Sequence, residues 1–215
     1  INNFTKATSK QKMSKFIYEE ISKTDTPQFI PKLVEKWNID LNLASPLQTT
    51  DLETSFKIVP KSTISPKHRD FQLRLLHRIL VTNKNLKLWK IKDSEKCTFC
   101  KEGVETIHHI LWDCIHSRRI WTALFEWIKN KTDSNITFSE QEIFLGINFE
   151  NMMVFNCIFI ISKQYLYACR CLNSSPNFTQ LLAKLLYYQN VEKYIATKNN
   201  KLQIHENKWS IFKEL

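Results

Sequence analysis

Three cysteines and two adjacent histidines within eighteen residues, CTFCKEGVETIHHILWDC, constrain the fold of this chain more than any other feature. Cys97 and Cys100 are separated by two residues, and His109 and Cys114 follow. A CxxC turn can direct two thiolates at one small cation, and a histidine with a later cysteine can complete the tetrahedron from a following helix. Three sulfurs and one imidazole suit Zn²⁺ better than Ca²⁺ or Mg²⁺, which prefer oxygen. The spacing therefore predicts a zinc site, which we expect to be structural because protein ligands fill all four positions.

Two other interpretations of these cysteines are weaker. A CxxC redox couple usually lies between a strand and a helix, whereas charged loop residues flank this pair. Three unrelated buried cysteines beside a surface histidine would also be ordinary, because free cysteine is often simply a small core residue. Within the zinc interpretation the histidine is the less secure ligand, since His108 and His116 lie near enough in the sequence to replace His109.

The composition favours helices over sheets. The chain has 215 residues, of which 43% are hydrophobic, so it can bury the core of one domain or of two small ones. Because it has only two glycines, a sandwich or barrel with many tight turns is disfavoured. We therefore predict a mainly α fold, a helical bundle-like arrangement with an embedded zinc knuckle of the Cys-Cys-His-Cys type and little or no β-sheet.

The most apolar stretch of the chain, MMVFNCIFIISKQYLYACRCL at 152–172, is expected to form a core helix. Asn156 and Lys163 interrupt it well before the eighteen or more apolar residues that a membrane span requires, so we expect no membrane partner. Its cysteines are expected to be buried thiols in a reducing compartment: Cys157, Cys169 and Cys171.

Apolar periodicity predicts most of the remaining elements. Before the metal ligands we expect two short helices within 13–42, then an irregular linker at 43–65 that could mark a domain boundary and could hold a helical turn at 51–58. A helix at 66–81 and a short helix capped by Thr82 should follow. After the metal ligands we expect a helix at 117–129, a polar loop at 130–135, a helix capped by Ser175 or Asn177, and a hairpin or extended tail from 196 to Trp209.

Positive charge is concentrated in one part of the chain. The formal net charge is +10, and residues 57–101 contain twelve Lys and Arg but only three Asp and Glu. Such a local excess is typical of a polyanion-binding surface, although an ordinary solvated helix face is the plain alternative. This concentration beside the predicted metal site favours nucleic-acid binding.

The helix expected at 66–81 separates into two faces. Its apolar residues form one arc, namely Phe71, Leu73, Leu75, Leu76, Ile79 and Leu80, and its polar residues form the other. Arg74 and Arg78 would lie one turn apart, a spacing compatible with adjacent phosphates. The candidate nucleic-acid contacts are Lys67, Arg74, His77, Arg78, Lys84, Lys87, Lys90, Arg118 and Arg119.

The same residues bear on the kind of partner. RNA or single strands are favoured over duplex reading, because no helix carries Asn, Gln and Arg spaced for base edges. Phe99 and Trp112 could stack on unpaired bases, although aromatic residues beside a small metal site are more often core. The sequence shows no glycine-rich phosphate loop, serine nucleophile motif, HExxH pair or carboxylates paired for two-metal catalysis. We therefore expect that this segment by itself is not an enzyme, and that two acid pairs, Asp93 with Glu95 and Glu140 with Glu142, are solvated.

One long run of the sequence is similar to a known family. The run LRLLHRILVTNKNLKLWKIKDSEKCTFCKEGVETIHHILWDCIHSRRIW resembles the zinc-binding segment after the thumb of non-LTR retrotransposon reverse transcriptases, in which a basic helix precedes the CxxC pair. The stretch from FLGI through AKLLYYQNVEKYIATKNNKLQIHENKW looks like the carboxy-terminal end of the mammalian-type LINE clade. The resemblance covers most of the chain, which begins without a methionine and which we expect to be a piece of a longer polyprotein.

The resemblance implies both an organisation and a role. It matches Cys97, Cys100, His109 and Cys114 to the family's metal ligands, residues 1–90 to a helical wrist-like region, and residues 91–215 to the zinc-knuckle C-terminal domain. The parent polyprotein would carry endonuclease and RNA-directed DNA polymerase activities. This segment would bind template RNA, target DNA or both during target-primed reverse transcription, in a cytoplasmic ribonucleoprotein and in the nucleus. A structural or protein-interaction domain that braces the polymerase is the alternative.

Overall fold

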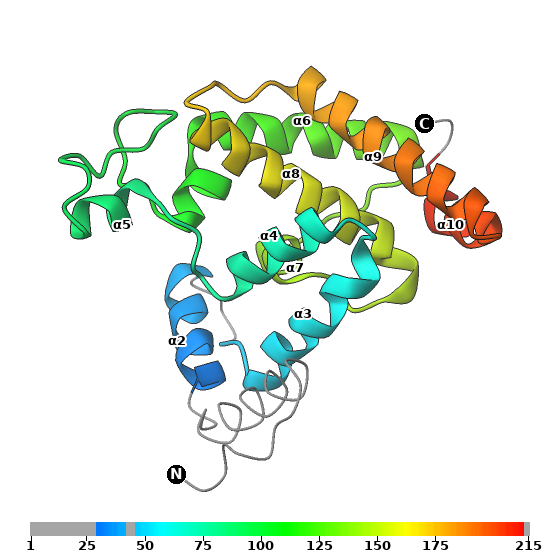
Figure 1. Cartoon of the computed structure of the whole chain (residues 1–215), viewed down its shortest axis with the longest axis horizontal. Coiled ribbons are helices and arrows are strands. Elements are labelled where there is room, and N and C mark those ends of the chain that lie inside the picture. Colours follow the sequence, from blue (N-terminus) through cyan, green and yellow to red (C-terminus); the bar gives the residue numbers. More distant parts are fainter. Residues whose placement is uncertain (1–28, 42–45, 213–215) are drawn as a thin grey trace, which may run out of the picture. The chain divides into compact units, whose positions relative to one another are not determined.

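The computed structural model describes residues 29–41 and 46–212 (Figure 1). Within these ranges the regular secondary structure is helical, and the only β-type pairing is an isolated antiparallel bridge between Lys96 and Val104. The predicted mainly α fold with little or no sheet is therefore confirmed. The chain divides into two compact units, Ile1–Thr49 and Thr50–Leu215, which are described separately below. The domain boundary predicted near residue 90 stays a prediction.

The described part of the first unit consists mainly of helix α2, Phe29–Leu41. Its buried residues are Leu33, Val34, Trp37 and Leu41; Trp37 follows the first two by four and three positions and Leu41 follows Trp37 by four, so they form one face. Asn38 Oδ1 accepts a hydrogen bond from the Leu47 amide at 2.7 Å. The first of the two helices predicted within 13–42 lies outside the described residues.

Helix α3, Thr49–Ser62, replaces most of the linker predicted at 43–65. The helical turn expected at 51–58 lies within α3, and the division between the two units falls inside the predicted stretch, but the irregular linker was wrong because the prediction counted serine and threonine as loop formers. In the structure the Ser55 and Ser62 hydroxyls each donate to the carbonyl four residues earlier, both at 2.9 Å, so these polar groups are satisfied inside the helix. Leu52 is fully buried and anchors one face of α3.

Helix α4, Pro66–Leu76, ends earlier than predicted. Arg78 adopts a left-handed backbone conformation with φ 57°, and its amide donates to the Leu75 carbonyl at 2.8 Å. The next amide, of Ile79, donates to the Arg74 carbonyl at 3.0 Å. These two bonds form a Schellman C-terminal cap. Arg74 and Arg78 therefore do not lie one turn apart on a helix, and that prediction is wrong.

The early end of α4 also changes its apolar face. Ile79 is 63% exposed and Leu73 is 37% exposed, so neither belongs to the buried arc that the sequence predicted. His68 and Gln72 lie inside instead, and Gln72 Nε2 donates to the Phe144 carbonyl at 2.8 Å. The predicted arc is confirmed for its remaining members, Phe71, Leu75, Leu76 and Leu80.

Helix α8, Met153–Cys171, is the centre of the second unit and contacts helices α4, α7, α9 and α10 (Figure 1). Every residue from 154 to 166 is buried, so the predicted core helix is confirmed. Cys157 and Cys169 are buried as expected, but Cys171 is exposed because it is the last residue of the helix, where the chain turns away from the core. In the part of the chain that the structure describes, none of the helices combines the length and apolar character of a membrane span.

Two predicted helices flank α8. Helix α6, Ile115–Thr132, extends further than the 117–129 expected and buries Ile120, Trp121, Leu124 and Ile128. Helix α9, Phe178–Lys198, begins after Asn177, whose side chain accepts a hydrogen bond from the Thr179 amide at 2.8 Å. Of the two caps proposed for this helix, Asn177 is confirmed.

Three further helical elements were not predicted. Helix α7, Glu140–Leu145, follows a capping box between Ser139 and Glu142, and a single 3₁₀ turn, Glu150–Met152, precedes α8. Helix α10, Leu202–Trp209, occupies the tail for which a hairpin or extended segment was expected. That expectation was wrong because α10 is held by a tertiary contact, in which Trp209 Nε1 donates to the Glu192 carboxylate on α9 at 3.0 Å.

Candidate metal centre

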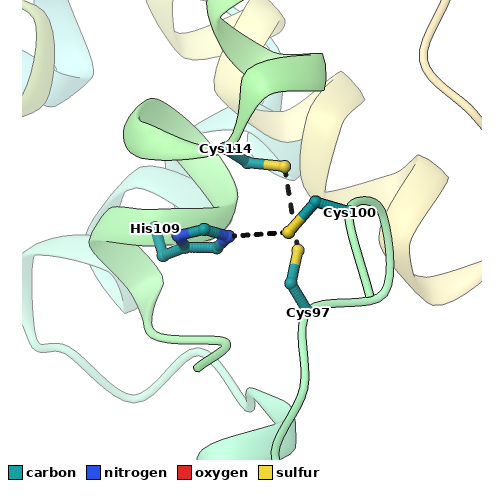
Figure 2. Close-up of side chains that lie close together, drawn as sticks. All are labelled: Cys97, Cys100, His109 and Cys114. Atoms are coloured by element: carbon teal, nitrogen blue, oxygen red, sulfur yellow. Dashed lines mark hydrogen bonds between the residues drawn. The ribbon is translucent and has the colours of Figure 1, made fainter. Parts of the chain in front are cut away.

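The four predicted ligands come together in the second unit (Figure 2). One side-chain ligand atom from each residue lies within 4.8 Å of the other three. The Sγ atoms of Cys97 and Cys114 are 3.8 Å apart, and Cys100 Sγ is 3.4 Å from His109 Nε2. A tetrahedral zinc ion would set these separations at about 3.8 Å for S–S and about 3.5 Å for S–N. The donor set and its spacing therefore fit a Cys₃His zinc ion.

A closed loop of backbone presents the first two cysteines. We call residues 95–105 the metal loop. Its ends pair through the Lys96–Val104 bridge, and the Cys97 amide donates to the Gly103 carbonyl at 2.7 Å. The Phe99 amide points at Cys97 Sγ, at 3.3 Å. A thiolate at this position would therefore gain a hydrogen bond in addition to a metal bond.

A π-helical turn, His109–Asp113, positions the other two ligands. The Cys114 amide closes it by donating to the His109 carbonyl at 2.8 Å. On a regular α-helix, residues five apart point about 140° away from each other. The wider turn is what allows His109 and Cys114 to face the same point, and such turns are frequent at functional sites.

The two competing histidines lie elsewhere. The His108 Nδ1 is 2.7 Å from Asp113 Oδ2, its Nε2 contacts the Glu140 carboxylate, and its ring stacks on Phe144 of α7. The ring of His116 lies beside Phe99 instead, with 6.3 Å between ring centroids. His109 is thus the histidine that the structure brings to the cysteines.

The acid pairs expected to be solvated are in part engaged. Glu140 contacts His108, and the Glu142 carboxylate accepts the Ser139 amide at 2.7 Å as part of a helix cap. Glu95 lies 3.3 Å from Lys87. These acids have partners within the protein, but the bonds of Glu142 are exposed and the Glu95 side chain is 37% exposed, so both remain surface groups as expected.

The thiols differ in acidity in the absence of a cation. Burial raises the pKa of Cys97 to about 12 and also raises the pKa of Cys114. Burial acts in the same direction on Cys100, but the backbone amides of Glu102 and Gly103 and the side chain of His109 outweigh it and lower its pKa to about 6. Zinc binding must therefore displace protons from the two more buried cysteines.

A buried carboxylate that the sequence analysis missed supports the metal loop. Glu105 is fully buried. It accepts hydrogen bonds from the Thr98 amide at 2.7 Å, from the Asn83 amide at 2.8 Å and from Arg170 Nε at 2.8 Å. Burial opposes its ionisation, but the bonds from Thr98, Asn83 and Arg170 hold its pKa below the usual range. The only sequence signal was the presence of two acids, Glu102 and Glu105, between the cysteine pair and the histidine, and charge patterning alone assigns both to solvent.

Most of the predicted nucleic-acid contacts reach the surface. Helix α5, Asn83–Leu88, begins after Thr82, which forms the predicted cap together with Asn85. The exposed members of the predicted set are Lys67, Arg74, Lys84, Lys87, Lys90, Arg118 and Arg119. Whether they contact nucleic acid stays a prediction.

Several of these side chains have partners within the protein. Arg74 forms an ion pair with Asp70 at 2.9 Å, and Arg118 lies 3.5 Å from Asp113. His77 and Arg78 are half-buried, and the ring of His77 lies 4.9 Å from that of Phe56, centroid to centroid. Burial lowers the pKa of His77, which disfavours a positive charge at this position.

The aromatic side chains also differ from expectation in their exposure. Phe99 and Trp112, the two stacking candidates, are half-buried, and the ring of Trp112 lies 5.6 Å from that of Trp121. Trp89, which follows α5 directly, is 54% exposed. Trp89 was not among the stacking candidates that the sequence suggested.

Part of the chain is similar to a known protein family. Residues 42–121 match a protein-family model described as zinc-binding in reverse transcriptase. The matched segment contains all four clustered ligands and helix α5. No curated protein matches the chain. This segment is therefore similar to a zinc-binding segment associated with reverse transcriptases, and its Cys₃His cluster can hold the metal.

Proposed function

We propose that this chain is a nucleic-acid-binding accessory module of a LINE-type, non-LTR retrotransposon reverse transcriptase. In this role it holds template RNA, target DNA or both during target-primed reverse transcription, within a cytoplasmic ribonucleoprotein and in the nucleus. The observation that carries the proposal is that a single matched segment, 42–121, contains both the Cys₃His cluster and the exposed lysines of α5.

The lysines supply the electrostatic part of the proposal. Lys84, Lys87 and Lys90 are exposed within and just after α5, and Arg119 and Lys67 are exposed elsewhere in the unit. Contacts from such side chains to phosphate release counterions, which gives affinity without sequence reading. Because contacts to phosphate do not read the bases, we expect the binding to have only modest sequence specificity.

The exposed tryptophan supports single strands over duplex. Trp89 lies in the sequence between Lys87 and Lys90, so an unpaired base that stacks on its ring would have phosphates close to both ammonium groups. Stacking on an aromatic side chain contributes about 1–3 kcal/mol per base and tolerates any base. Trp89 takes the role for which the sequence suggested Phe99 and Trp112.

In this proposal the zinc ion has a structural role. Three cysteines and one histidine supply four protein ligands, which leaves no position for a reacting water. Polymerase and endonuclease chemistry would then belong to other parts of the polyprotein, and this segment would bind and position nucleic acid.

One observation favours a second candidate function, a protein-interaction domain that braces the polymerase. Beside Trp89, two aliphatic side chains are strongly exposed, Leu88 at 77% and Ile91 at 67%. An exposed apolar cluster of this kind is common where another protein surface docks. The ion pair of Arg74 with Asp70 also reduces the charge available to phosphate on α4.

Metal analysis and salt-titrated binding test the proposal together. We expect one zinc per chain and an affinity for single-stranded RNA whose logarithm falls linearly with the logarithm of salt concentration. Duplex RNA and duplex DNA of equal length, measured in parallel, report the preferred partner. A zinc-loaded, folded chain with no salt-dependent affinity for any of the three would support the protein-interaction function instead.

A further inference from the structure

The buried Glu105 side chain connects three separate parts of the second unit. Its Oε2 accepts from the Thr98 amide, inside the CxxC turn. Its Oε1 accepts from the Asn83 amide, at the first residue of α5, and from Arg170 near the end of α8. The metal loop, the lysine-bearing helix and the core helix therefore share one carboxylate.

Asn83 extends this connection. Its Oδ1 accepts hydrogen bonds from Arg170 Nη2 at 3.1 Å and from Lys92 Nζ at 3.0 Å. Its Nδ2 donates to the Lys96 carbonyl at 2.8 Å and to Glu105 Oε2 at 3.2 Å. The first residue of α5 is thus bonded to both ends of the metal loop and to α8.

We propose that Glu105 is a positioning residue that couples metal binding at the Cys₃His cluster to the ordering of α5 on the core. Four hydrogen bonds from three elements end on one carboxylate. Because Thr98 lies between two of the ligands, any rearrangement of the CxxC turn on metal loss moves a donor of Glu105. Metal occupancy then determines how firmly the N-terminus of α5 is held. The RNA consequence given below rests on the function proposed above, whereas the coupling itself does not.

The chemistry of the site requires a carboxylate in particular. All the groups directed at Glu105 are donors, and an ionised carboxylate is an acceptor at both oxygens. A glutamine here would turn an NH₂ group toward at least one donor, and the buried guanidinium of Arg170 would lose its counter-charge. Glu105→Gln therefore preserves shape but removes the coupling.

Amide hydrogen exchange, measured by NMR on zinc-loaded and chelator-stripped protein, tests the proposal. The Leu86 and Trp89 amides donate hydrogen bonds to the carbonyls of Thr82 and Asn85 and so report the order of α5. In the wild type, removing zinc should speed the exchange of these two amides by about ten-fold or more. In Glu105→Gln these amides should exchange fast in both states. Glu102→Gln, an exposed glutamate in the same loop, is the matched control and should behave as the wild type.

A second variant and a second readout complete the test. If circular dichroism shows that Glu105→Gln does not fold, Arg170→Gln removes one partner of the same carboxylate and should weaken the zinc dependence of exchange in α5. Zinc affinity, measured by chelator competition, should fall about 10- to 100-fold in Glu105→Gln and stay unchanged in Glu102→Gln.

The RNA measurement separates this proposal from the proposed function. Removing zinc should weaken binding of single-stranded RNA to the wild type but should make little difference in Glu105→Gln. If no variant binds RNA, the proposed function fails and the exchange data still decide the coupling. Exchange in α5 that is indifferent to zinc in the wild type, or that keeps its full zinc dependence in Glu105→Gln, would overturn the role of Glu105.

Discussion

Gly103 lies directly against the imidazole ring of His109. A Cβ atom at this glycine would come 2.8 Å from Cε1 of the ring and 3.3 Å from each ring nitrogen. Carbon atoms in proteins essentially never approach so closely, so any side chain here must displace the ring. The missing side chain of Gly103 thus leaves the space in which His109 can turn its Nε2 toward the cysteines.

Gly103→Ala should therefore lower zinc affinity by about 10- to 100-fold, as is typical when the surroundings of a metal ligand are disturbed. Chelator competition measures the change. Gly146→Ala is a suitable control because that residue has φ +100° and its Cβ would meet Ile58 at 3.2 Å, far in sequence from the ligands. Gly146→Ala should lower Tm and leave zinc affinity unchanged. If Gly103→Ala binds zinc as tightly as Gly146→Ala does, the contact between Gly103 and the His109 ring does not matter for the metal.

Cys97→Ser should remove stoichiometric zinc and lower Tm, because the binding free energy of a structural zinc ion is also folding free energy. Atomic emission on the dialysed protein and thermal unfolding with and without added zinc measure the two effects. Cys171→Ser, which changes an exposed thiol, should leave both unchanged. A Cys97→Ser protein that retains metal and Tm would remove the zinc assignment.

Lys163→Met should destabilise the fold by about 1–3 kcal/mol. Lys163 is 1% exposed, and its Nζ donates to the Ile143 carbonyl at 2.6 Å and to the Phe144 carbonyl at 3.1 Å. Burial lowers the pKa of Lys163 well below its usual value. Methionine fills the space but leaves the Ile143 carbonyl without this donor. Urea unfolding measures the loss, and Lys193→Met on exposed α9 surface should show none.

The logarithm of the affinity for single-stranded RNA should fall linearly with the logarithm of salt concentration, and each phosphate contact contributes about 0.7 to the slope. Replacing Lys84, Lys87 and Lys90 together with alanine should therefore make that slope shallower by about two units. Fluorescence anisotropy across a salt series measures the slope. The control triple variant removes three exposed lysines outside the matched segment, Lys129, Lys193 and Lys198, and has the same net charge. Equal slopes in the two variants would show that α5 makes no special contribution.

Stability should fall at mildly acidic pH because of His68. Burial, together with Lys67 and Lys184, lowers the pKa of this residue to about 4, and its ring packs edge-on against Tyr188. Neither ring nitrogen has a hydrogen-bond partner among the described residues. An unfolded histidine binds its proton near pH 6.5, so between these values the unfolded state holds more protons. The stability that comes from keeping this imidazole neutral in the folded state is fully present above pH 6.5. It is lost as the pH falls toward 4, and the free energy of unfolding then drops by up to about 3 kcal/mol.

Urea unfolding of zinc-saturated protein between pH 7.5 and 5 measures this loss. His68→Leu should reduce the pH dependence over that range, because the variant has no imidazole to protonate at this position. An unchanged pH profile in the variant would show that His68 is not the responsible group.

The sequence predicted several elements whose information is local, and it failed at positions where a tertiary contact or an uncommon backbone conformation decides. The ligand spacing, the Thr82 cap and the apolar run of α8 are all readable within a few turns of chain. The left-handed Arg78 is not readable in this way, because arginine rarely ends a helix in that conformation. Likewise, α10 depends on Glu192 of another helix, and Glu105 gains its role from Arg170, which is distant in sequence.

The π-helical turn between His109 and Cys114 has a consequence for the length of this segment. Its wide turn contains one residue more than an α-helical turn would between the same two ligand positions. Deleting one residue here would allow an ordinary helix, on which side chains four apart also share a face. Homologous chains with one residue fewer between these two ligands should therefore keep a working centre.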